Sequence, residues 1–188
     1  HEYEMTDNVR LELKNLPDNV LVTEPLPKEM KVKLKDKGDK LVEYKTRGKM
    51  KTLDIDYRHY SHAMGRTAIY GPELEKLIAA GLASSTEIVS TSLDTLQYYV
   101  ADARGVKLPV RLHGVISADN QLVVERVTLV PDSVVVHAAH QFTDTMTAVY
   151  TPLVRCVGLT DSVRQTLDLK SSQWGVRYSP SEVQLSIA

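Results

Sequence analysis

The chain has 188 residues, of which 43% are hydrophobic and 25% charged, and its formal net charge is −1. This length fits one large domain or two small ones, and the balanced charge excludes a general electrostatic attraction to nucleic acid or membranes. A lone cysteine, Cys156, excludes an internal disulfide, and the sequence contains neither an apolar run long enough to span a membrane nor a signal peptide.

The first part of the chain alternates apolar and polar residues with a period of two, which predicts half-buried strands. Residues 30–35 alternate three apolar side chains with three lysines, and residues 53–56 alternate apolar residues with aspartates. Turn signals lie at residues 17–19 and 36–39. We therefore expect short antiparallel strands in this part of the chain.

One helix is expected next, over about residues 71–83. Pro72 suits a first helical turn, and Glu73 favours the positive end of the helix dipole. The apolar residues that follow fall on one face of a helix; they are Leu74, Leu77, Ile78 and Leu82. The pattern predicts that this is the only substantial helix.

Strand patterns return in the second part of the chain. Residues 106–111 alternate, and short β-branched runs follow at 122–124, 127–130 and 134–136. Many short strands joined by polar turns are typical of a mainly β, antiparallel, sandwich-like fold.

The sequence also repeats itself, because four pairs of segments recur in the same order. They are 9–11 with 106–108, 26–32 with 130–136, 52–55 with 166–169, and 89–101 with 176–188. Such a repeat predicts two tandem β modules, residues 1–101 and 102–188, in which residues 58–86 are the main addition to the first.

The repeated motifs resemble the YbbR-like domain family. The opening strand 106–110, the Pro-x-x-Val-x-Val strand 131–136 and the Thr-rich segment 143–151 occur in the order typical of the family, followed by Gly158 to Ser162, Thr166 to Leu169 and the closing strand 179–187. The resemblance covers the second module nearly end to end and the first more loosely.

The resemblance implies two curved, mostly antiparallel YbbR-like modules, the first with the helix insertion. It also implies a position outside the cytoplasmic membrane of a bacterium, behind an N-terminal membrane helix. We expect the chain, which starts at His1, to be a processed or truncated piece without that helix. Some proteins of this family regulate a membrane diadenylate cyclase, and the family has no known catalytic residues.

A stripe of lysines is the main candidate contact surface. Lys31, Lys33, Lys35 and Lys37 alternate along one predicted strand, and residues 28–51 contain ten Lys or Arg against four Asp or Glu. The stripe fits an anionic membrane, an anionic envelope polymer or an acidic partner. It equally fits a solvated face, or lysines that protect a sheet edge from aggregation. Nucleic acid is not expected, because Tyr44 is the only aromatic residue within this segment.

Catalytic and metal-binding patterns are weak. Asp54 and Asp56 share a strand face, which a solvated surface explains. The pairs His59/His62 and His137/His140 lack nearby cysteine or glutamate ligands in zinc spacing. We therefore predict no enzyme activity, cofactor or metal.

Aromatic residues leave a second possibility open. The tyrosines at 57, 60, 70, 98 and 99 either line a carbohydrate or peptide groove or complete a small core. Trp174 is expected in the second core or at its rim. Together with the family resemblance, the sequence favours an extracytoplasmic, membrane-tethered interaction or regulatory module. The alternatives are a β module that binds an envelope polysaccharide and, third, a hydrolase.

Overall fold

The computed structural model describes residues 1–47, 52–60 and 63–188, without the side chain of Arg47. Its contacts divide the chain into two compact units. Unit 1 comprises residues 1–17 and 25–99, and unit 2 comprises residues 18–24 and 100–188. The assignment of family modules to residues 1–101 and 102–188 stays a prediction.

The first half of the chain contains seven described strands and three helical segments. In order they are β1 (Glu2–Lys14), β2 (Val20–Glu24), β3 (Glu29–Lys37), α1 (Gly38–Arg47), β4 (Thr52–Asp56), the 3-10 helix η1 (Tyr57–His59), β5 (Gly65–Ile69), α2 (Gly71–Ala79), β6 (Glu87–Thr91) and β7 (Leu96–Asp102).

The second half contains seven strands and one short helix. They are β8 (Val106–Ala118), β9 (Val127–Val130), β10 (Ser133–His137), α3 (His140–Thr143), β11 (Val149–Leu159), β12 (Val163–Asp168), β13 (Arg177–Ser179) and β14 (Glu182–Ile187). The predicted mainly β, antiparallel-rich fold class is confirmed.

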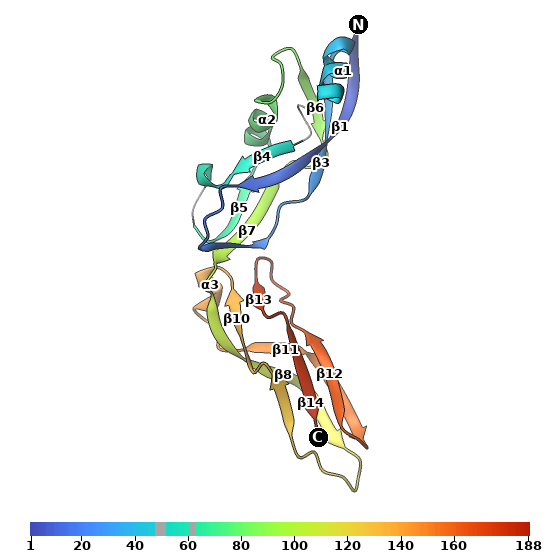
Figure 1. Cartoon of the computed structure of the whole chain (residues 1–188), viewed down its shortest axis with the longest axis vertical. Helices are drawn as coiled ribbons and strands as arrows, with labels where there is room; N and C mark the ends of the chain where they lie inside the picture. The colour runs from blue at the N-terminus through green and yellow to red at the C-terminus, as the bar shows by residue number, and fades with distance from the viewer. Residues whose placement is uncertain (48–51, 61–62) are drawn as a thin grey trace. The chain divides into compact units, whose positions relative to one another are not determined.

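The two halves share one sheet topology (Figure 1). A four-stranded sheet has the order β4-β1-β3-β6 in the first half and β11-β8-β10-β13 in the second. In both sheets the first pair of neighbours is parallel and the other two pairs are antiparallel. Three-stranded sheets, β2-β7-β5 and β9-β14-β12, complete the repeat.

Three of the four repeated sequence pairs occupy equivalent strands. The pair at 9–11 and 106–108 lies on β1 and β8. The closing pair forms the central strands β7 and β14, where Tyr98 and Leu185 are fully buried. The pair at 26–32 and 130–136 forms β3 and β10, and Val32 and Val136 are both fully buried. The alternation of the sequence therefore places equivalent side chains in the two cores.

The repeat match between residues 52–55 and 166–169, which share the sequence Thr-Leu-Asp, is wrong. Residues 52–56 form β4, which runs parallel to β1 in a four-stranded sheet. Residues 166–168 belong to β12, which runs antiparallel to β14 in a three-stranded sheet. By strand order, β4 corresponds to β11 and β5 to β12. The prediction that residues 58–86 are an addition to the first module is therefore wrong for β5, which has a counterpart in the second half. Short alternating segments resemble one another because any half-buried strand has the same period, whatever its neighbours.

Helix α2 lies where the sequence predicts it. Leu74 and Ile78 are fully buried, and Leu77 and Leu82 pack against the same core while staying half-buried. The prediction of a single substantial helix is wrong, because α1 has ten residues. Leu41 and Tyr44, three positions apart, bury one face of α1. The surrounding lysines obscured this face in the sequence.

Each half has its own hydrophobic core. The core of the first half gathers residues of β1, β3, α1, β4, β5, α2 and β7, and the core of the second gathers residues of β8, β10, β11, β12 and β14. Trp174 does not anchor the second core, since 65% of it is exposed. No helix in the described ranges has the length and apolar character needed to cross a membrane.

Candidate functional site

The lysine stripe lies on β3 with the predicted orientation. Met30, Val32 and Leu34 are buried in the core, and the alternating lysines point to the other face. Strand β3 lies between β1 and β6, so the stripe is in the middle of its sheet. The interpretation of these lysines as protection for a sheet edge is therefore wrong.

Glutamates on the neighbouring strands reduce the positive charge of this face. The Nζ of Lys33 lies 3.3 Å from a carboxylate oxygen of Glu4. Lys35 is paired in register with Glu4 on β1 and with Glu87 on β6. The face therefore mixes both signs of charge, and its role in binding an anionic surface stays a prediction.

The acidic residue of β3 points inward. Asp36 is buried and accepts hydrogen bonds from the hydroxyls of Ser85 (2.9 Å) and Thr86 (2.6 Å) and from the backbone N–H of Lys37 (2.7 Å). The Thr86 hydroxyl is the main cause that holds the pKa of Asp36 below its usual value. This network joins β3 to the segment between α2 and β6, which is a structural role.

The paired aspartates of β4 have a local role as well. Asp56 accepts hydrogen bonds from the backbone N–H and the guanidinium of Arg58 and caps η1. These bonds lower the pKa of Asp56 well below its usual value, with the Arg58 side chain as the largest cause. Asp54 is exposed.

The histidine pairs do not form a metal site among the described residues. His62 lies outside the described residues, and His59 is exposed with its Nε2 3.8 Å from Asp56. His137 is buried and its Nδ1 lies 3.1 Å from the carbonyl oxygen of Asp102, whereas His140 is exposed.

The tyrosines of the first half are divided between core and surface. Tyr57 and Tyr98 are buried, Tyr60 and Tyr99 are half-buried, and Tyr70 is exposed. Burial raises the pKa of Tyr98. Five tyrosines close in sequence therefore do not form one exposed aromatic platform.

An exposed apolar row that the sequence did not reveal lies on β11. Tyr150 is 60% exposed, Leu153 71% and Val157 55%. Tyr150 and Leu153 are three residues apart, so regular alternation would put them on opposite faces. A register shift between these two residues places both on the outer face, with Thr151 buried between them.

Side-chain hydrogen bonds hold this shift in place. The hydroxyl of Thr151 accepts from the backbone N–H of His113 at 2.9 Å and donates to the carbonyl oxygen of Pro152 at 3.0 Å. On β8, Gly114 has φ +153°, and a Cβ there would overlap the carbonyl oxygen of Val154. A glycine is thus required for β8 and β11 to approach each other closely.

Strand β11 lies at one end of its sheet, with β8 as its paired neighbour. The outer side chains of the two strands are paired in register as Arg111 with Tyr150, His113 with Leu153, and Val115 with Arg155. All six are exposed. We call these six residues the β8/β11 face.

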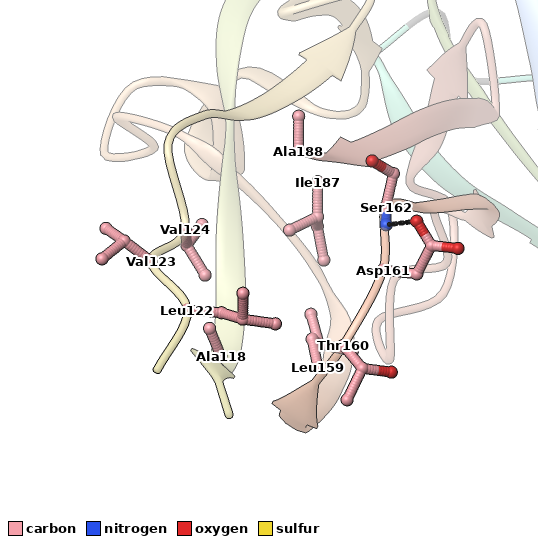
Figure 2. A pocket seen from close by; sticks show the side chains of 10 residues that line it. All are labelled: Ala118, Leu122, Val123, Val124, Leu159, Thr160, Asp161, Ser162, Ile187 and Ala188. Atoms are coloured by element: carbon pink, nitrogen blue, oxygen red, sulfur yellow. Dashed lines mark hydrogen bonds between the residues drawn. The ribbon is translucent and has the colours of Figure 1, made fainter. Parts of the chain in front are cut away.

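A recess lies at the ends of the same two strands, where Ala118 of β8 pairs with Leu159 of β11. Figure 2 shows Leu122 and Ile187 directed toward this cavity of about 240 Å³ and Val123 pointing away from it. On the opposite side, the backbone N–H of Ser162 donates to Asp161 at 2.8 Å. The recess at the ends of β8 and β11 is lined by both apolar and polar residues.

The fold of this chain is similar to those of two solved structures. A YbbR-like protein from Streptococcus pneumoniae TIGR4 matches 100% of this chain and 95% of its own, with 13% identity and a TM-score of 0.49. SuR18C from Streptococcus thermophilus matches 44% of this chain and 79% of its own, with 20% identity and a TM-score of 0.35. No family model and no curated protein matches the chain. The first structure bears the family name that the sequence motifs indicate.

Proposed function

We propose that this chain is a non-enzymatic interaction module of a membrane-tethered bacterial protein and acts on the extracytoplasmic side of the membrane. The observation that carries the proposal is the exposed row of Tyr150, Leu153 and Val157 on a strand at the end of its sheet. Large apolar side chains gathered on an exposed surface mark a place where another molecule binds. A strand with a free edge also offers backbone groups to a partner strand.

A protein partner fits this surface better than a polysaccharide does. The polysaccharide alternative requires several exposed aromatic side chains on one face, whereas Tyr57 and Tyr98 are buried in the core. Only one of the three residues in the exposed row is aromatic. The resemblance to YbbR-like proteins adds a specific partner, a membrane diadenylate cyclase, which the protein would regulate.

The proposed function is tested by producing this chain together with a membrane diadenylate cyclase in one bacterial host. The full chain is fused behind an N-terminal membrane helix and exported to the outer face of a bacterial host that makes no cyclic di-AMP. A membrane diadenylate cyclase is produced in the same cells, and cyclic di-AMP is measured at equal cyclase levels. We expect the tethered chain to change the amount of cyclic di-AMP.

Matched variants connect the effect to the proposed surface. Leu153→Glu should abolish it, because a charge replaces the centre of the apolar row. Val130→Glu places the same charge on an exposed apolar residue of β9 in unit 2, away from the β8/β11 face and the recess, and should leave the effect intact. A cyclic di-AMP level that does not respond to the tethered chain would contradict cyclase regulation.

A further inference from the structure

The β8/β11 face combines apolar and basic groups in an ordered way. Each of its three cross-strand pairs joins one apolar residue to one arginine or histidine. Strands β8 and β11 contain no aspartate or glutamate along their whole length. Arg111 and Arg155 have no ion-pair partner within the described part of the chain. The positive charge of this face is therefore not neutralised by neighbours on the sheet.

The equivalent strands of unit 1 show that the fold does not require such a face. Strand β4 holds the position of β11 but has five residues, two of them aspartates. Glu12 of β1 pairs in register with Asp54 and lies 2.7 Å from the Nζ of Lys14. The same topology thus carries a short, acidic, internally paired surface in one unit and an apolar, basic surface in the other.

We propose that the β8/β11 face binds an extended protein segment that presents both apolar and acidic side chains on one of its faces, at every second residue. Apolar side chains of the segment would lie against Tyr150, Leu153 and Val115, and its carboxylates would lie beside Arg111 and Arg155. The need for both kinds of side chain follows from the pairing, since every apolar residue of the face has a basic neighbour across the strands. This inference rests on the proposed function and specifies which kinds of side chain the partner must present.

Strand geometry favours a protein segment over a lipid surface. A strand at the end of a sheet has backbone N–H and C=O groups that a partner strand can pair with and that hydrocarbon cannot. The pairing of β11 with β8 is regular from Leu153 to Cys156, between two register shifts. We therefore place the bound segment along this regular stretch, beside Arg155.

Charge-matched peptides test the inference on the full chain. The probe is a short labelled peptide that has valine and glutamate in turn at every second residue and threonine at the residues between, so that valine and glutamate share one strand face. The comparison peptide has lysine in place of glutamate. Binding is measured by fluorescence anisotropy at low and at physiological salt. We expect the glutamate peptide to bind, the lysine peptide to bind at least about tenfold more weakly, and added salt to weaken binding.

Reversing the charges of the two arginines of the face should make it prefer the lysine peptide over the glutamate peptide. The variant Arg111→Glu/Arg155→Glu should lose at least about tenfold in affinity for the glutamate peptide, or about 1.4 kcal/mol, and gain affinity for the lysine peptide. Arg164→Glu, an exposed arginine on β12 of the same unit, should change neither affinity. A gain for the lysine peptide also shows that the double variant is folded.

Three results would overturn the inference. They are equal binding of the two peptides, glutamate-peptide binding that survives the double reversal, and preferential binding of the face to anionic lipid vesicles. A chain that changes the cyclic di-AMP level and yet binds neither peptide keeps the proposed function and refutes this partner chemistry. Peptide binding without any effect on cyclic di-AMP supports the partner chemistry and contradicts regulation of the cyclase.

Discussion

The hydroxyl of Tyr44 connects helix α1 to the segment that follows α2, so replacing Tyr44 with phenylalanine should destabilise unit 1. The ring is buried in the core. Its hydroxyl accepts a hydrogen bond from the backbone N–H of Ala83 at 2.8 Å and donates to the hydroxyl of Thr86 at 2.6 Å. Thr86 in turn donates to Asp36. Phenylalanine keeps the ring and removes only the hydroxyl.

The expected loss is about 2 kcal/mol of unfolding free energy. A hydrogen bond contributes roughly 1 kcal/mol net, and the variant loses two of them. The half-buried N–H of Ala83 is also left without its partner, which costs more than a bond exchanged for one with water. No cavity is created, because the ring volume is nearly unchanged, so the measured loss reports on the hydrogen bonds.

Urea unfolding combined with native-state hydrogen exchange at the β3 amides measures this loss within unit 1. The midpoint should fall while the m-value stays constant. Tyr3→Phe is the matched control, since Tyr3 is exposed, and its effect should stay within about 0.5 kcal/mol. Equal effects of the two substitutions would refute the role of the Tyr44 hydroxyl.

Three further predictions concern packing, pH and surface charge. Leu74→Ala should cost about 2–5 kcal/mol in a urea titration, since the side chain is fully buried in the first core and leaves a cavity; a loss below about 1 kcal/mol would contradict this packing. The pKa of Asp102 is lowered to about 2 from an ordinary 3.8, chiefly by hydrogen bonds from the Arg104 side chain. Its stabilising effect is therefore present above about pH 4 and lost as the pH falls through 2, and a plot of melting temperature against pH should be flatter for Asp102→Asn. Reversing the charges of three β3 lysines should leave the melting temperature nearly unchanged. If that face meets a membrane, the same change should weaken binding to anionic liposomes. Unchanged liposome binding would identify a solvated face. The substituted residues are Lys31, Lys33 and Lys35.

The sequence by itself determined which side chains of many strands face the core. The alternation along β3 correctly separated Met30, Val32 and Leu34 from the lysines, and the closing repeat correctly matched β7 with β14. Helix α2 also followed from local signals, namely Pro72 near its start and apolar residues at helical spacing. These features depend on periodicity within one segment, which a single sequence contains.

Only the tertiary structure decided which strands are neighbours and which lie at a sheet's end. Alternation has the same period in β4 and β12, so it did not distinguish a parallel partner of β1 from an antiparallel partner of β14. It also did not show that β3 is central. These properties come from contacts between segments distant in sequence, and no local pattern encodes them.

The candidate site depended on one local irregularity. In regular alternation Leu153 would face inward together with Thr151. The register shift, held by hydrogen bonds of Thr151 and by the close approach at Gly114, turns Leu153 outward beside His113. The sequence supplied the residues of the β8/β11 face, but the pairing of two strands about forty residues apart determined that they share a surface, because register is fixed by the partner strand.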